Sequence, residues 1–235
     1  MNLSALLQDF TLLDLIALGS LLVGWLGLGW IIENPPKSRP STSVLVAELR
    51  RDWMRCFVTR QPRLFDASVV DSLRNSTAFF ASTILLALGA CVALLGDVER
   101  MRMIASDFTL QSSRHALEIK IILVMILVAN AFLKFVWANR LFGYCSIMMA
   151  AVPNDPEHPV AYPRAAQAAE VNVSAARSFN RGLQSTYFAM AALAWIAGAV
   201  PLMAAVAITC GVMIRREFTS ASRQAILTDL RDNPL

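Results

Sequence analysis

The segment from Tyr187 to Ile214, YFAMAALAWIAGAVPLMAAVAITCGVMI, contains no charged residue. Three further apolar segments accompany it, at about 12–32, 77–96 and 119–138. A helix needs roughly 20 consecutive apolar residues to cross the hydrocarbon core of a bilayer, and each segment meets or approaches that length. The sequence therefore predicts an all-α integral membrane protein, a four-helix bundle in which residues 1–235 form a single membrane domain.

The composition supports this class. Apolar residues make up 56% of the 235 residues and charged residues only 16%, whereas a soluble domain carries about 25% charged residues. The net charge of +4 comes from arginines near segment ends, which fits membrane topology better than the continuous basic face of a nucleic-acid-binding protein. Asp9 and Asp14 stand where a signal peptide has basic residues, so the first segment is expected to remain as a span.

No cofactor, metal centre or catalytic residue is predicted. The four cysteines are singly spaced, and His115 and His158 form no pair, so neither a disulfide framework nor a zinc site fits. The motifs of phosphate-binding loops, metalloproteases and serine hydrolases are missing from the sequence. A non-enzymatic role is therefore favoured.

Lysine and arginine counts in the connecting segments predict the orientation. Loop one (33–76) has eight, loop two (97–118) three, loop three (139–186) four, and the tail (215–235) four. Placing loops one and three in the cytoplasm puts 12 of these residues inside and 7 outside. We expect a periplasmic N-terminus, cytoplasmic large loops and an outside C-terminus, although the four arginines of the tail conflict with its placement.

The large loops are predicted to contain helices. From Ser41 to Thr59, apolar residues fall on one stripe and arginines on the other side, so this helix can lie at the lipid headgroups or pack on the chain's own bundle. A short helix is expected to begin at Asp66, a good N-cap, and to run towards Ser76.

Two longer helices are expected to extend into the cytoplasm. The segment from His115 to Ala150 has no proline, and a continuous helix there would be about 54 Å long, against roughly 30 Å for the hydrocarbon core. The segment from Ala165 to Leu183 is expected to lead directly into the last span. Pro201 is expected to kink that span.

Polar residues inside spans are the default functional candidates. Asp14 and Lys120 lie near the outer ends of their spans, where they can pair or each meet interfacial water. Asn130 and Lys134 lie deeper, on one face of the third segment. Lys134 can extend its ammonium to the cytoplasmic interface, or both side chains can line a path for an anion.

The cytoplasmic loops contain a second candidate cluster. Converging guanidiniums can bind a phosphate-bearing ligand or anionic lipid headgroups; alternatively, they form salt bridges with Glu48, Asp52 and Glu170. The cluster consists of Arg50, Arg51, Asp52, Arg55, Asn139, Arg140, Arg177, Asn180 and Arg181.

Small residues spaced four apart allow membrane helices to approach closely. Packing within the bundle is the default explanation, and a subunit interface is the alternative. The residues concerned are Ser20 with Gly24, Gly89 with Ala93, Ala194 with Gly198, and in addition Gly27 and Gly29.

The segment RSFNRGLQSTYFAMAALAW, from Arg177 to Trp195, resembles a bacterial membrane family named only domain of unknown function 599. Arg51-Asp52-Trp53-Met54 and Arg216-Glu217-Phe218 are similar to other recurring features of that family. The resemblance covers nearly the whole chain and implies a bacterial inner-membrane setting. It implies no reaction, cofactor or ligand, and it draws attention to Arg51, Asp52, Asn180, Arg181, Arg216 and Glu217.

Two functions follow as hypotheses. The first is a non-enzymatic membrane protein that acts through assembly, as a homo-oligomer or as a subunit of a membrane complex. The alternative is a channel or transporter for a small solute, with anions among the options. The expected partners are the lipid bilayer, anionic lipids included, and a second membrane protein, but no nucleic acid.

Overall fold

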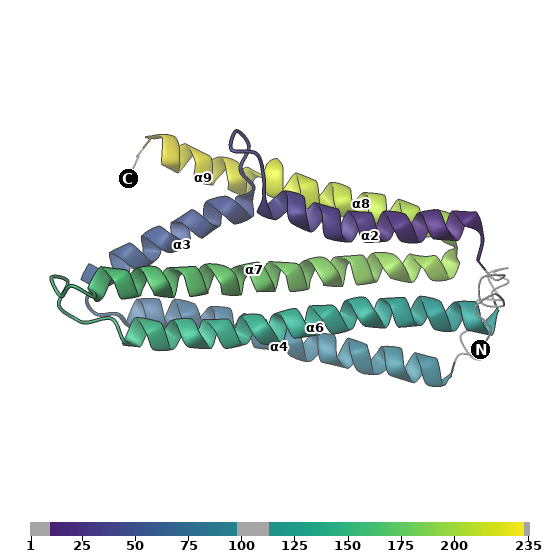
Figure 1. Ribbon diagram of the computed structural model, residues 1–235, viewed down its shortest axis with the longest axis horizontal. Helices are drawn as coiled ribbons and strands as arrows, with labels where there is room; N and C mark the ends of the chain where they lie inside the picture. The colour runs from purple at the N-terminus through teal and green to yellow at the C-terminus, as the bar shows by residue number, and fades with distance from the viewer. Residues whose placement is uncertain (1–9, 98–112, 233–235) are drawn as a thin grey trace. The chain divides into compact units, whose positions relative to one another are not determined.

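The computed structural model describes residues 10–97 and 113–232, and every regular element in these ranges is a helix. This confirms the predicted all-α class. Within these ranges, four segments are long and apolar enough to span a membrane, and they begin at Leu12, Leu64, Arg114 and Ala199. The helices in chain order (Figure 1) are α2 (Leu12–Glu33), α3 (Thr42–Thr59), α4 (Leu64–Gly96), α6 (Arg114–Ala150), α7 (Ala161–Leu193), the 3-10 helix η1 (Ala194–Ala197), α8 (Ala199–Phe218) and α9 (Ala221–Asp232).

Helices α4 and α6 are longer than a hydrocarbon core requires. The 37 residues of α6 form one helix, as predicted. The 33 residues of α4 join the short helix and the second span, which were predicted to be separate. No proline interrupts α4, so nothing ends the helix between the two parts. Asp66 consequently lies in the first turn of α4 rather than before a short helix.

The last predicted span is wrong as a single helix. Helix α7 ends at Leu193, inside the segment 187–214, and α8 begins at Ala199. Between them Gly198 has φ +124° and ψ 175°, a conformation that is essentially confined to glycine. Pro201 lies in the first turn of α8, where the missing N–H costs no helical hydrogen bond. It therefore begins a helix instead of kinking one.

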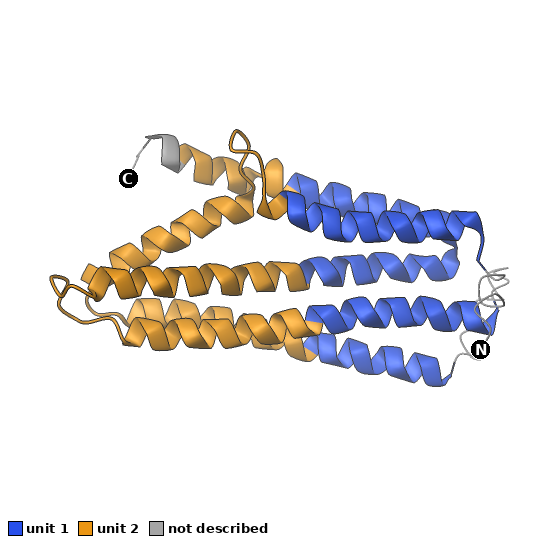
Figure 2. Ribbon diagram, in the orientation of Figure 1, with its two compact units in different colours: residues 1–31, 83–131, 183–215 blue, residues 32–82, 132–182, 216–235 orange. Residues whose placement is uncertain are grey.

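The chain forms two compact units (Figure 2). Unit 1 comprises residues 1–31, 83–131 and 183–215, and unit 2 comprises residues 32–82, 132–182 and 216–235. Helices α4, α6 and α7 each contribute one part to each unit. Residues 98–112, which hold most of loop two, lie outside the described ranges.

In unit 1, α2 packs against the end of α7 and against α8. A Cβ at Gly24 would lie 3.2 Å from Phe188 of α7 and 3.3 Å from Val206 of α8. Phe188, ten positions before Gly198, and Val206, eight positions after it, therefore both lie beside Gly24 of α2. The end of α7 and the start of α8 therefore form a helical hairpin that turns at Gly198.

Polar contacts fix α2 and α7 in antiparallel register. The Trp25 indole N–H donates to Ser185 Oγ at 3.2 Å, and Gln184 donates to the Trp25 carbonyl at 2.5 Å. Eleven residues earlier on α2, Asp14 accepts from Trp195 at 2.7 Å. Gln184 also approaches Gly29, where a Cβ would lie 2.8 Å from its Oε1. Close packing within the chain thus accounts for Gly24 and Gly29.

In unit 2, α3 packs its apolar stripe on the chain's own helices. Leu45, Met54, Phe57 and Val58 of α3 are buried, which supports the bundle-packing alternative for this helix. Ser41 caps α3 by accepting from Val44 N. The core around it is completed by Val70, Phe142, Cys145, Met149, Val152, Ala161, Ala165, Ala168, Ala169 and Ala175.

An aromatic cluster forms a second part of the unit 2 core. The rings of Phe80, Phe135 and Phe179 lie 5.4 Å apart, centroid to centroid, in all three pairs. A Cβ at Gly182 would lie 2.8 Å from the Phe135 ring. Glycine at this position therefore lets α7 approach α6 closely.

Candidate functional site

Helices α3 and α7 run antiparallel in unit 2, and their polar residues meet in order along the pair. Arg51 contacts Glu170, Arg50 contacts Asn172, and Asn180 contacts Ser43. From the first pair to the last, the residue number falls on α3 and rises on α7, so the two helices are in antiparallel register. Most of the candidate cluster predicted from the sequence lies along this pair of helices.

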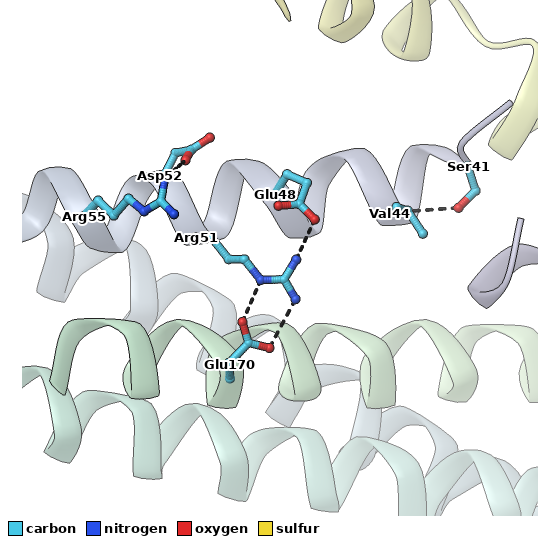
Figure 3. A network of polar contacts seen from close by, with 7 residues as sticks. All are labelled: Ser41, Val44, Glu48, Arg51, Asp52, Arg55 and Glu170. Carbon is cyan, nitrogen blue, oxygen red and sulfur yellow. Dashed lines mark hydrogen bonds and ion pairs between the residues drawn. The ribbon is translucent and has the colours of Figure 1, made fainter. Parts of the chain in front are cut away.

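Arg51 forms the most complete of these contacts (Figure 3). Its Nε and Nη2 donate to the two carboxylate oxygens of Glu170, at 2.6 and 3.1 Å, and its Nη1 donates to Glu48 at 2.6 Å. The hydrogen bond from Arg51 lowers the pKa of Glu170 and, in turn, raises the pKa of Arg51. This is a bidentate ion pair between α3 and α7.

The neighbouring arginines have separate partners. Arg55 pairs with Asp52 at 3.5 Å on α3, and Figure 3 shows this pair on a different side of α3 from Arg51. Arg181 donates to both oxygens of Glu33, at 2.6 and 2.5 Å, and this contact raises the pKa of Arg181. These ion pairs support the salt-bridge alternative for this part of the predicted cluster.

Three further members of the predicted cluster lie on α6 and α7 in unit 2. Arg140 donates to Tyr144 Oη at 2.8 Å, one turn along α6. Asn139 donates to the carbonyl of Arg74 on α4 at 3.0 Å. Arg177 is exposed on α7 and acts on Glu170 only through its charge.

Arg50 differs from the other arginines of α3. Its Nη1 donates to Oδ1 of Asn172, which is fully buried. Asn172 in turn lies 3.5 Å from the Cys145 sulfur, and that thiol donates to the Ala168 carbonyl at 3.5 Å. Burial lowers the pKa of Arg50.

Sequence reasoning missed a buried carboxylate in unit 2. Asp66 is fully buried and accepts from Trp53 at 2.6 Å and from Arg60 at 2.5 Å. Arg63 donates nearby to the carbonyls of Val58, Val152 and Pro153. The available signal was the position of Trp53 on an otherwise apolar stripe, since a buried indole N–H needs an acceptor.

The tail contacts the beginning of α3 in unit 2. Glu217, which is 7% exposed, accepts from Ser43 N at 3.0 Å and from Ser43 Oγ at 2.9 Å. Thr42 donates to the carbonyls of Arg216 and Glu217, and Arg223 donates to that of Pro40. These contacts bring the tail beside the start of loop one, although the sequence-based count assigned the two to opposite sides of the membrane.

Unit 1 contains a polar group formed by three helical elements. One oxygen of Asp14 accepts from the Trp195 indole, and the other accepts from Thr11 N and Oγ1 at 3.0 and 2.8 Å. Lys120 is 6% exposed, and its ammonium lies 5.7 Å from the Trp195 ring centroid. Asp14 and Lys120 are thus brought together around Trp195, without a direct ion pair.

The other two intramembrane candidates lie farther along α6. Asn130, in unit 1, and Lys134, in unit 2, are both partly exposed. The structure records no hydrogen bond or ion pair between either side chain and the other described residues.

The described residues contain no group of three or more histidine, cysteine, aspartate or glutamate side chains that could hold a metal ion. All four cysteines are free thiols, and Cys56 is the exposed one. The hydrogen bonds of Arg51 with Glu170, Arg181 with Glu33 and Trp25 with Ser185 join helices to one another.

Comparison with known proteins shows to which protein family the chain belongs. No curated protein and no solved structure matches the chain. The model of one family, described as "Protein of unknown function, DUF599", matches residues 16–222. That range includes the ion pairs of α3 and α7, the hairpin at Gly198 and the contacts of Glu217. The chain therefore belongs to the DUF599 family of proteins of unknown function.

Proposed function

We propose that this protein is a non-enzymatic, multi-pass membrane protein that acts through assembly, with a second copy or with another membrane protein. The observation that carries the proposal is the bare face of α2. A Cβ at Gly19 or Gly27 would meet nothing within 4 Å. Between and beside these glycines, Val23, Leu26 and Trp30 are 72%, 62% and 67% exposed.

Glycine on a bare helix face needs a reason. In a helix interior glycine costs about 1 kcal/mol relative to alanine, and lipid chains pack against alanine equally well. A second helix does benefit, because small residues let the two backbones approach closely. Gly24 and Gly29 already serve this purpose toward α7 and α8, and Gly19 and Gly27 supply the same surface for a partner.

The mass of the purified protein in detergent or nanodiscs tests the proposal. We expect at least two chains per particle, or a co-purifying membrane protein, and we expect Gly19→Leu with Gly27→Leu to release single chains. Gly143→Leu is the matched control, because a Cβ at Gly143 also meets nothing within 4 Å but lies in unit 2. A strictly single-chain wild-type particle without a partner would contradict the proposal.

We further propose a bacterial inner-membrane location with the N-terminus in the periplasm and loop one, loop three and the tail in the cytoplasm. Support comes from the contacts of Glu217 and Arg223 with the start of α3. With the tail beside loop one, 16 lysines and arginines lie on the cytoplasmic side and 3 on the other. This removes the conflict in the sequence-based count.

A second candidate function is a channel or transporter for a small solute, anions included. The observation in its favour is Lys120, a buried cation with no hydrogen bond or ion pair to a described residue. An intramembrane charge of this kind marks pathways in many transporters. Liposome flux tests it: Lys120→Met, Asn130→Ala and Lys134→Ala should each lower flux, and unchanged flux in all three would remove these residues from any path.

A further inference from the structure

Arg50 carries a buried positive charge that no acidic side chain balances. Its Nη1 donates to Asn172, while its Nε is buried and has no acceptor in the described part of the chain. No described carboxylate lies within ion-pair distance of it. Arginine keeps its proton in proteins, so the charge persists even though burial lowers the pKa of Arg50.

The surroundings of Arg50 are neutral. Asn172 and Cys145 are fully buried, and both are uncharged partners in the hydrogen-bond chain that ends at the Ala168 carbonyl. Their apolar neighbours in the unit 2 core include Met54 and Phe142. An uncompensated charge in such a place is costly, which indicates that an anion completes the site.

The remaining donor of the Arg50 guanidinium defines what can bind. Nη1 is occupied by Asn172 and Nε is buried, so Nη2 is the donor left for an oxygen of a carboxylate or phosphate. Arg50 itself remains partly exposed, so an oxyanion can approach from the surface of unit 2.

We propose that Arg50, oriented by Asn172, is a binding site for a phosphate or carboxylate oxyanion, supplied by a soluble ligand or by a lipid headgroup. This site goes beyond the proposed assembly function and does not depend on it. Arg55, on the same helix, already pairs with Asp52 and is not expected to contribute.

Thermal unfolding of the full-length protein, followed by circular dichroism, tests the site. In neutral detergent, chloride is replaced by phosphate or acetate at constant ionic strength; in nanodiscs, phosphatidylcholine is compared with added phosphatidylglycerol. We expect one of these anions to raise the unfolding midpoint of the wild type. In Arg50→Lys this rise in midpoint should be at least tenfold smaller, and in Arg55→Lys it should equal that of the wild type. A response to phosphate or acetate identifies a soluble ligand, and a response to phosphatidylglycerol alone identifies a headgroup.

Asn172→Asp provides a test that does not remove the arginine. This nearly isosteric change gives Arg50 an internal carboxylate, so we expect a higher midpoint without ligand and no response to the anions. The proposal is overturned if the wild type responds in none of the arms. It is equally overturned if Arg50→Lys or Asn172→Asp responds as strongly as the wild type.

Discussion

At the residue scale, Asp66 is the side chain whose loss should cost unit 2 most. It is fully buried, and its carboxylate joins Arg60 to Trp53. Removing one partner of a buried ion pair leaves the other charge and the indole N–H without an acceptor. We expect Asp66→Ala to destabilise the protein by about 3 kcal/mol, measured by thermal unfolding in detergent.

Asp71→Ala is the matched control for this prediction. Asp71 lies on the same helix, is exposed, and contacts only Asn75 among the described residues. We expect the unfolding midpoint of Asp71→Ala to stay close to that of the wild type. Equal effects of the two substitutions would show that the Asp66 contacts contribute little.

The Arg51–Glu170 ion pair makes a prediction about pH. Arg51 lowers the pKa of Glu170 in the folded protein, so the pair's contribution is present above the ordinary glutamate pKa of about 4.3. It is lost as pH falls through the lower folded pKa. We expect Glu170→Gln to weaken the loss of stability below about pH 4, relative to the wild type.

This comparison is made with unfolding midpoints from pH 7 to pH 3. Glu157→Gln, at an exposed position before α7, should follow the wild-type curve. Because Glu170 is largely exposed, solvent screening keeps the expected difference small. If, below about pH 4, the unfolding midpoint of Glu170→Gln fell as steeply as that of the wild type, the pair would not stabilise the folded state.

At the element scale, hydropathy predicted where the chain is membrane-embedded but not how the last segment folds. The segment from Tyr187 to Ile214 is apolar throughout, and that pattern suits one long span and a hairpin equally well. The distinguishing signals were local: a length above roughly 20 residues, and Gly198 three positions before Pro201. Helices α2 and α6 were predictable because no such break interrupts them.

The polar contacts were less predictable than the helices. Sequence reasoning named Arg51 and Arg181, and it listed Glu170 as a partner. Which carboxylate faces which arginine depends on the antiparallel register of α3 and α7, and no local pattern encodes that register. Glu33 on α2 and Asp66 on α4 were also missed, because their partners lie on other elements or at unpatterned spacing.

The hairpin itself can be tested at Gly198. The backbone there has φ +124°, a region where any residue with a Cβ is strained by about 1–3 kcal/mol. We expect Gly198→Ala to lower the unfolding midpoint. Gly211→Ala on α8, where a Cβ meets nothing within 4 Å, should leave the midpoint unchanged or raise it. An unchanged unfolding midpoint in Gly198→Ala would argue against the turn at Gly198.

At the scale of the whole molecule, the proposed topology uses the hairpin at Gly198 to add one membrane crossing. In the proposed topology the end of α7 is a fifth membrane-embedded segment, in addition to the four candidate spans of the described residues. An odd number of crossings places the N-terminus and the tail on opposite sides. The contact between Glu217 and Ser43 supports the same proposed placement.

The side of the membrane on which the tail lies directly tests the proposed topology. Fusions after Leu235 with green fluorescent protein, which fluoresces only in the cytoplasm, and with alkaline phosphatase, active only in the periplasm, report it. A phosphatase fusion within loop two is the control and should be active. We predict a fluorescent tail and an inactive tail phosphatase; an active phosphatase with no fluorescence would contradict the hairpin and the contacts of Glu217.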